Sequence, residues 1–360
     1  MATKKKLLQA AAGAAGDAGL NVEEVFSTYL YEGTGSAQTI TNGIDLDGEG
    51  GLVWAKRRDG TGDHWLVDTE RGLDKSLKTN TTDANNTGSQ QILSFDSDGF
   101  TLAAGQGNSF ENDSAGNYVA WNWKAGGTAS SNTDGSITSS VSANQDAGIS
   151  ILTYTGNGTS GATIGHGLGK KPSLIIIKNR NDSAQDWPVQ HSSIGATGQL
   201  VLSSSAGVNY SSVYWNNTEP TSSVFTVGSA NNVNKSGNSH VAYVFSEIDG
   251  FSKFGKYIGN GSADGAFIYT GFRPAWIMIK GTSAYSWHII DTKRIGYNDS
   301  NRVLLANTTD PEQTNYSVQE RDILSNGFKM RDSNAGTNAS GSTYIYLAFA
   351  ENPFKYANAR

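Results

Sequence analysis

The sequence predicts an all-β protein made of three tandem antiparallel β-sandwiches behind a short N-terminal arm or helix. Glycine is abundant, with 43 residues among 360, whereas proline is scarce, with 6. Charged residues make up 17% of the chain, below the usual quarter. This composition is typical of short strands joined by turns, and the jelly roll is one form that such sandwiches take.

A threefold repeat predicts the three modules. Each copy begins with a similar stretch, YLYEGTGSAQTI, LTYTGNGTSGATI or GKYIGNGSADGAFI, and continues into an apolar strand that carries a lysine. A tryptophan follows that strand, and an alternating apolar strand closes the copy. The aligned positions are Tyr31, Tyr154 and Tyr257; Lys56, Lys178 and Lys280; Phe100, Phe225 and Phe328. We expect the other aligned aromatic residues to be core: Trp65, Trp187 and Trp287; Trp123, Phe245 and Phe349.

The spacing of these repeats sets the predicted boundaries. Tyr31 and Tyr154 are 123 residues apart, whereas Tyr154 and Tyr257 are 103 apart. The additional residues form a Gly/Ser/Thr-rich linker that ends in a predicted strand, SITSSVSA. We therefore predict a docking arm over 1–26, a first sandwich over 27–126, a linker strand with the second sandwich over 127–252, and a third sandwich over 253–360.

The N-terminus has three lysines before an alanine-rich stretch, which is the outline of a secretory signal. Because Gln9, Gly13 and Gly16 interrupt the apolar stretch, we favour an arm that docks onto a partner. The residues predicted to make that contact are Lys4, Lys5, Lys6, Leu7 and Leu8.

The stretch YTGNGTSGATIGHGLGKKP, residues 154–172, resembles a phosphate-binding loop only at first sight. Ile164 stands where the first glycine of such a loop should be, and Lys170 is followed by Lys171 and Pro172 instead of Ser or Thr and a helix. Since YTGNG recurs as YEGTG and YIGNG, we predict a strand-to-strand turn that needs positive φ.

The sequence offers little catalytic chemistry, and we predict no enzyme, no cofactor and no metal site. Cysteine is absent, and the five histidines are scattered singly. The acids Asp68 and Glu70 follow the tryptophan of the first copy as Asp291 follows that of the third, so we expect a structural turn or an interfacial ion pair. Asp45 to Gly50, DLDGEG, could supply oxygens to calcium, but a twelve-residue loop with its closing glutamate is missing.

Recognition of a glycan is the predicted role of residues outside the repeat. The stretch at 207–223 places Tyr210, Tyr214 and Trp215 among asparagines and serines, and Tyr285 is a weaker case. Aromatic faces stack on sugar rings, and amides and hydroxyls hydrogen-bond to their hydroxyls. The alternative is that Trp215 lies in a strand and fills the core.

Four stretches resemble repeat modules of virion structural proteins from tailed bacteriophages, marine phages especially: ITNGIDLDGEGGLVWAKRRDGTGDHWLVDTERG, GATIGHGLGKKPSLIIIKNRNDSAQDW, TGFRPAWIMIK and YLAFAENPFKYANAR. This resemblance implies a tail fibre, tail tip or related appendage. The alternatives are a capsid decoration or head-fibre protein, and a carbohydrate-binding adhesin module. A polysaccharide-degrading enzyme is a further alternative, but no paired acids across a cleft are evident.

The expected partners are other virion proteins, of the tail or the capsid, and a host-surface glycan. A net charge of −6 argues against nucleic acid, and no apolar run is long enough to insert into a membrane. We expect the protein on the virion after assembly in the host cytoplasm. Exposed strand edges favour a homo-oligomer, with a trimer as first choice, although three internal copies also permit a pseudo-threefold monomer.

Overall fold

The computed structural model describes residues 20–87, 91–105, 112–295, 298, 302–313 and 320–352. Strands account for most of the described secondary structure, and all paired strands are antiparallel apart from one isolated bridge between Ile137 and Ile164. The all-β prediction is confirmed. No helix within the described ranges is long and apolar enough to cross a membrane.

The first third of the chain, residues 26–124, forms a large and a small sheet, which we call lobe 1. The six strands of the large sheet are, in spatial order, β1 (Phe26–Glu32), β9 (Asn117–Lys124), β3 (Gly51–Arg57), β4 (His64–Asp68), β5 (Lys75–Lys78) and β6 (Asn86–Thr87). The small sheet consists of β2 (Gln38–Thr41), β8 (Gly99–Leu102) and β7 (Ile92–Asp96).

Residues 130–245 form lobe 2. Its large sheet has the order β10 (Ser130–Asn132), β11 (Ser139–Asn144), β12 (Ile149–Thr155), β19 (Ser239–Phe245), β14 (Leu174–Asn179), β15 (Pro188–His191), β16 (Gly198–Val201) and β17 (Asn209–Tyr210). The small sheet pairs β13 (Ala162–Gly165) with β18 (Val224–Val227), and α2 (Ser212–Trp215) and α3 (Asn231–Asn234) are single helical turns. The predicted linker strand SITSSVSA is confirmed by β11.

Residues 252–350 form lobe 3. The order of its large sheet is β20 (Ser252–Ile258), β27 (Thr343–Ala350), β22 (Pro274–Gly281), β23 (Trp287–Asp291) and β24 (Leu304–Leu305). Its small sheet is β21 (Phe267–Tyr269), β26 (Gly327–Met330) and β25 (Arg321–Leu324), and α4 (Thr292–Ile295) follows β23. The order β1-β9-β3-β4-β5 of lobe 1 recurs as β12-β19-β14-β15-β16 and as β20-β27-β22-β23-β24.

Both faces of each large sheet are buried, which explains the long apolar runs in the sequence. In β14, Ile175 and Ile177 pack toward the small sheet of lobe 2, in one cluster with Phe225. Their neighbours Leu174 and Ile176 belong to a different cluster, which contains residues of all three lobes. Alternate residues of one strand therefore serve two cores.

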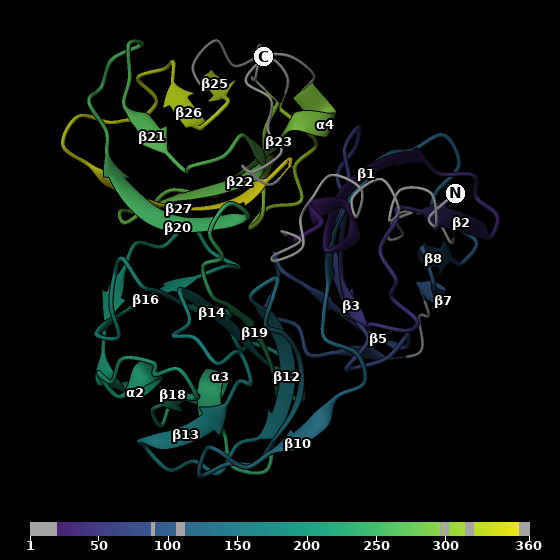
Figure 1. The fold of residues 1–360 in the computed structure, drawn as a ribbon, viewed down its shortest axis with the longest axis vertical. Coiled ribbons are helices and arrows are strands. Elements are labelled where there is room, and N and C mark those ends of the chain that lie inside the picture. The colour runs from purple at the N-terminus through teal and green to yellow at the C-terminus, as the bar shows by residue number, and fades with distance from the viewer. Residues whose placement is uncertain are drawn as a thin grey trace, which may run out of the picture.

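The shared cluster lies where the three large sheets meet, and Figure 1 shows the lobes as three bodies around this centre. Trp123, Phe245 and Phe349, one from each lobe, contact one another there. Their ring centroids are 6.4 Å apart for Trp123 and Phe245, 5.6 Å for Trp123 and Phe349, and 5.9 Å for Phe245 and Phe349. The cavity at this place measures only about 30 Å³ and is lined mainly by apolar side chains. The aligned aromatic residues are buried, as predicted, and Trp123, Phe245 and Phe349 make the pseudo-threefold centre.

The described part of the predicted arm belongs to this centre as well. The 3-10 turn η1 (Val22–Glu24) precedes β1, and Val22, Val25 and Phe26 are buried in the shared cluster. The Phe26 ring lies 5.1 Å from Trp123 and 5.4 Å from Phe349, between centroids. Residues 22–26 are thus part of the folded unit, and residues 1–19, with Lys4 to Leu8, lie outside the described residues.

The repeated glycine turns have the predicted conformation. Gly35, Gly158 and Gly261 have φ of +73°, +73° and +67°. Beside each turn, a fully buried asparagine accepts a backbone N–H through its side-chain oxygen, at 2.9–3.0 Å. These asparagines are Asn112, Asn234 and Asn338. The glycine-rich loops are therefore structural turns held by a repeated asparagine, and the predicted strand-to-strand turn with positive φ is confirmed.

Candidate functional site

Several buried charged side chains lie at the junctions between the lobes. Lys56, Lys178 and Lys280 occupy equivalent places on β3, β14 and β22, and all three are fully buried. Because an ammonium in a low-dielectric interior needs acceptors, each is surrounded by backbone carbonyl oxygens. Burial lowers the pKa of Lys178 and of Lys280 to about 8.

Each lysine donates to a carbonyl of another lobe, and the three contacts form a closed ring. Lys178 Nζ donates to Thr82 O of lobe 1 at 3.0 Å. Lys280 Nζ donates to Ser205 O of lobe 2 at 3.4 Å, and Lys56 Nζ donates to Thr309 O of lobe 3 at 3.4 Å. Lobe 2 therefore contacts lobe 1, lobe 3 contacts lobe 2, and lobe 1 contacts lobe 3.

Beside two of the three lysines, a tryptophan ring nitrogen also donates to a carbonyl of another lobe. Trp187 Nε1 donates to Lys78 O at 3.1 Å, and Trp287 Nε1 donates to Val201 O at 2.8 Å. In lobe 1 this place belongs to His64, because Lys56 pairs with His64 as Lys280 pairs with Trp287. The predicted alignment of Trp65 with the other two tryptophans is therefore wrong by one residue, although Trp65 is buried.

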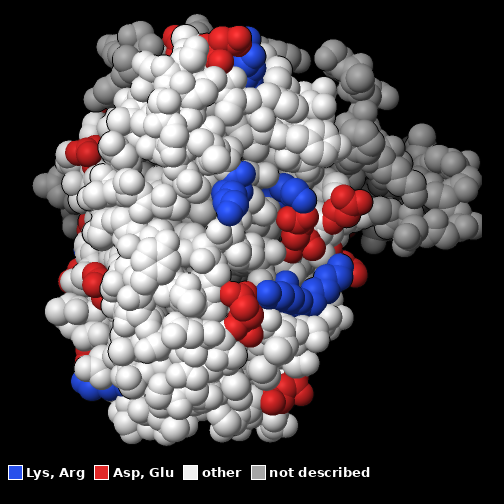
Figure 2. Space-filling view, turned by 90° about the vertical axis from the view of Figure 1, so that its left-hand side faces the viewer, with Lys and Arg blue, Asp and Glu red and all other residues white. Residues whose placement is uncertain are grey.

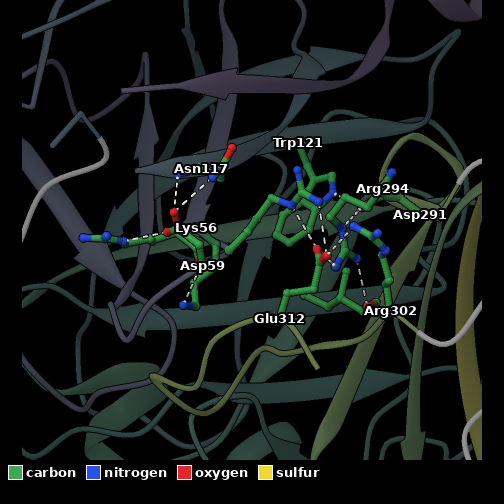
Figure 3. A network of polar contacts seen from close by, with 11 residues as sticks. Lys56, Asp59, Asn117, Trp121, Asp291, Arg294, Arg302 and Glu312 are labelled. Atoms are coloured by element: carbon green, nitrogen blue, oxygen red, sulfur yellow. Dashed lines mark hydrogen bonds and ion pairs between the residues drawn. The ribbon is translucent and has the colours of Figure 1, made fainter. Parts of the chain in front are cut away.

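At the junction of lobes 1 and 3, one carboxylate collects three arginines (Figure 3). Glu312 accepts from Arg58 Nε at 2.9 Å, from Arg294 Nη1 at 3.1 Å and from Arg302 Nη1 at 3.2 Å. Burial alone would raise the pKa of Glu312, but the Arg58 hydrogen bond and the charges of Arg294 and Arg58 lower it. Arg294 also pairs with Asp291, which accepts from Trp121 Nε1 of lobe 1 at 3.0 Å.

The junction of lobes 1 and 2 has an ion pair like that of Asp291 and Arg294, again with a hydrogen bond from the neighbouring lobe to the aspartate. Asp68 and Arg71 form an ion pair at 2.5 Å with both side chains fully buried, and Tyr243 Oη of lobe 2 donates to Asp68 at 2.6 Å. The predicted structural or interfacial ion pairs at Asp68 and Asp291 are thus confirmed. Glu70 stands between Asp68 and Arg71 in the chain and is half-buried. Burial and the nearby charge of Asp68 raise the pKa of Glu70 to about 7.

The outer surface contrasts with these charged junctions. Figure 2 shows a face on which a few charged side chains are scattered among uncharged ones, in line with the low charged content. Within the described ranges, no group of three or more His, Asp or Glu side chains is placed so that it could hold a metal ion. Asp45, in the stretch considered for calcium, accepts the Gly48 N–H at 2.7 Å and so stabilises its own turn.

The aromatic residues predicted to bind a glycan do not form a common surface. Trp215 is fully buried in the core of lobe 2, so its predicted stacking on a sugar is wrong. The alternative that it fills the core is confirmed, although it does so from helix α2 and not from a strand. Tyr214 is half-buried against the same core, and Tyr285 is half-buried too. Only Tyr210 of the four is well exposed, with 71% of its surface accessible.

Sequence reasoning missed the arginines and their partners at the junctions. Arg58 and Glu312 are 254 residues apart, and no local pattern joins them. The signal that could have found Arg58 is its place in the repeat, two residues after the aligned lysine, where Arg180 stands in the second copy.

The comparisons with known proteins agree with a unit that spans all three lobes. A family model described as a domain of unknown function (DUF7483) matches residues 22–353. The chain belongs to this family. The match begins where Val22 enters the shared core and ends shortly after β27. Neither a curated protein nor a solved structure matches the chain significantly.

Proposed function

We propose that this DUF7483 chain is a structural protein of a bacteriophage virion, a component of a tail fibre, tail tip or related appendage assembled in the host cytoplasm. The observation that carries the proposal is the closed ring of buried lysine contacts. Buried lysines that hydrogen-bond from one lobe to the next hold the lobes together, which favours a rigid assembly unit over an enzyme with a cleft. The resemblance of the repeats to phage virion proteins supports the same assignment.

In this proposal the lobes are three tandem β-sandwich modules, close to 27–126, 127–252 and 253–360. In support, residues of a large and a small sheet share one core in lobe 1, with Phe100, and in lobe 2, with Phe225. Phe328 has the corresponding place in lobe 3. A threefold arrangement inside one chain favours a monomeric unit, and a homotrimer is the alternative.

Residues 1–19 are the proposed attachment to a tail or capsid partner, and the lobes then expose their loops to a host-surface glycan or to neighbouring subunits. A capsid decoration or head-fibre protein, or an adhesin module, would likewise attach through residues 1–19 and expose the loops of its lobes. The residues that attach must lie before the shared core, against which Leu20 and Val22 already pack.

Deletion of residues 1–19 is expected to exclude the protein from particles without unfolding it. The variant would be supplied in trans to the phage that encodes the chain and lacks its own copy, and purified particles would be probed by immunoblot. The matched control removes residues 353–360 from the other end and should still be incorporated. Particles that carry the Δ1–19 protein at the full-length level would contradict the docking role. Absence of the full-length chain from particles would contradict the virion assignment.

A further inference from the structure

Two arginines stand at equivalent places in the ring but have different surroundings. Arg58 and Arg180 each lie two residues after the buried lysine of their strand. The backbone oxygen of each accepts an N–H from the adjoining lobe: Glu312 N donates to Arg58 O at 2.7 Å, and Asn85 N donates to Arg180 O at 3.0 Å. Glu312 and Asn85 are therefore equivalent as well.

The side chains at these two places differ by one negative charge. Glu312 pairs with Arg58, whereas Asn85 is neutral and makes one long contact, of 3.4 Å, with Arg71. Among the described residues, Arg180 has no ion pair, and its buried Nε has no hydrogen-bond partner. Burial and the charge of Arg71 lower the pKa of Arg180 by more than the charge of Asp68 raises it, so the protein itself stabilises this cation incompletely.

Arg180 also lines two open cavities of about 310 Å³ each, and Ser239 lines both with it. The walls carry hydroxyl and amide groups from β10, β11, β12 and the segment after β14: Ser131, Ser140, Thr153, Thr155 and Asn181. No Asp or Glu in the described chain lines either cavity. The second cation, Lys75, is already paired with Asp74 at 2.7 Å.

These features specify the chemistry of a ligand. A guanidinium without a carboxylate partner binds an anionic group through charge-assisted hydrogen bonds. Hydroxyl and amide groups around it can donate to and accept from a polyhydroxylated molecule. The volumes admit a sugar residue or two, within the usual range of small-molecule sites.

We infer that Arg180 and the cavities around it bind an acidic saccharide, whose anionic group takes the place that Glu312 occupies beside Arg58. The site lies at the junction of lobes 1 and 2 and needs both, since Asn85 and Lys75 come from lobe 1 and Ser131 and Arg180 from lobe 2. This inference names a ligand class for the proposed host-surface role. Binding itself can be tested without that role, and only its biological meaning rests on the proposed function.

The experiment measures binding to the purified full-length protein by titration calorimetry. The probes are oligosaccharides of galacturonic acid, of sulfated galactose and of phosphorylated mannose, each beside its uncharged parent, and inorganic sulfate alone. We expect at least one acidic oligosaccharide to bind more tightly than both its parent and sulfate. Arg180→Gln should weaken that binding by about tenfold or more, as loss of a charged hydrogen-bond partner does.

A second variant repeats the test without removing the arginine. Asn85→Glu places an acid where lobe 3 has Glu312, so it should pair with Arg180 and also weaken binding by about tenfold. Lys256→Gln, at an exposed lysine on β20, removes the same charge elsewhere and should leave binding unchanged. Equal binding of acidic and neutral sugars, equal binding of free sulfate, or unchanged affinity in Asn85→Glu would each overturn the inference. These results would leave incorporation into particles untouched.

Discussion

Replacement of Trp123 by alanine is expected to lower the free energy of unfolding by about 3–5 kcal/mol, the usual cost of truncating a buried tryptophan. Only 3% of Trp123 is exposed. Its ring contacts Phe26, Phe245, Trp276 and Phe349, so the cavity would open where all three lobes meet. Chemical denaturation of the wild type and the variant measures the difference.

Tyr210→Ala is the matched control, because it truncates an aromatic residue that is 71% exposed and should change stability by less than about 0.5 kcal/mol. Hydrogen exchange gives a second readout. Faster exchange in Trp123→Ala should reach β12 and β20 as well as β1, since the lost contacts belong to all three lobes. A loss below about 1 kcal/mol, or one confined to lobe 1, would contradict the shared centre.

Acidification is expected to destabilise the fold strongly below about pH 6.5. Burial lowers the pKa of His191 and His240 to about 4 and that of His288 to about 3. Burial and the charge of Lys56 lower that of His64 as well. Neutral histidine is therefore built into the fold, whereas the unfolded chain takes up protons near pH 6.5.

The sign follows from this difference in bound protons. Above pH 6.5 both states are neutral at these residues and the stability is complete. As the pH falls toward 4, the unfolded chain binds protons that the fold excludes, so the free energy of unfolding decreases. Three such histidines lower it by on the order of 5 kcal/mol between pH 7 and pH 5. Glu70 partly offsets this loss of stability. Its pKa is raised to about 7 in the fold, so on acidification the folded state binds a proton there before the unfolded chain does.

Denaturation curves at pH 7.5, 6 and 5 measure the effect, and His191→Gln tests its cause. His191 Nε2 lies 3.2 Å from Tyr346 O, a hydrogen-bonding contact across the junction of lobes 2 and 3. Glutamine can donate there but does not titrate, so the variant should lose less stability on acidification than the wild type. The pH slope is the readout, whatever the stability of the variant at pH 7.5. A flat wild-type curve from pH 7 to pH 5 would contradict the prediction.

Much of the fold can be predicted from the repeat, because local patterns specify strands and turns. The turn that follows the first strand of each copy requires positive φ, and each copy has a glycine at that position, namely Gly35, Gly158 and Gly261. Trp123, Phe245 and Phe349 were predicted as core on the same grounds. The repeat could not show that these three residues meet, because contact between copies depends on how whole sheets pack.

The candidate sites were predicted less well, for two physical reasons. Trp215 was predicted either to stack on a sugar or to fill the core from a strand. It fills the core, but from a single helical turn, which carries almost no periodicity that a sequence could reveal. The arginine sites depend on pairing across the ring. Arg58 and Arg180 look alike in sequence, and only the lobe opposite decides that one is neutralised by Glu312 and the other faces Asn85.

Differential scanning calorimetry of the wild-type protein tests most directly whether the three lobes are one unit. If they share the aromatic centre and the ring of lysine contacts, unfolding should be a single transition whose calorimetric and van't Hoff enthalpies agree. Separate transitions, or a calorimetric enthalpy about three times the van't Hoff value, would mean that the lobes unfold independently and that the closed ring is not what holds the molecule together.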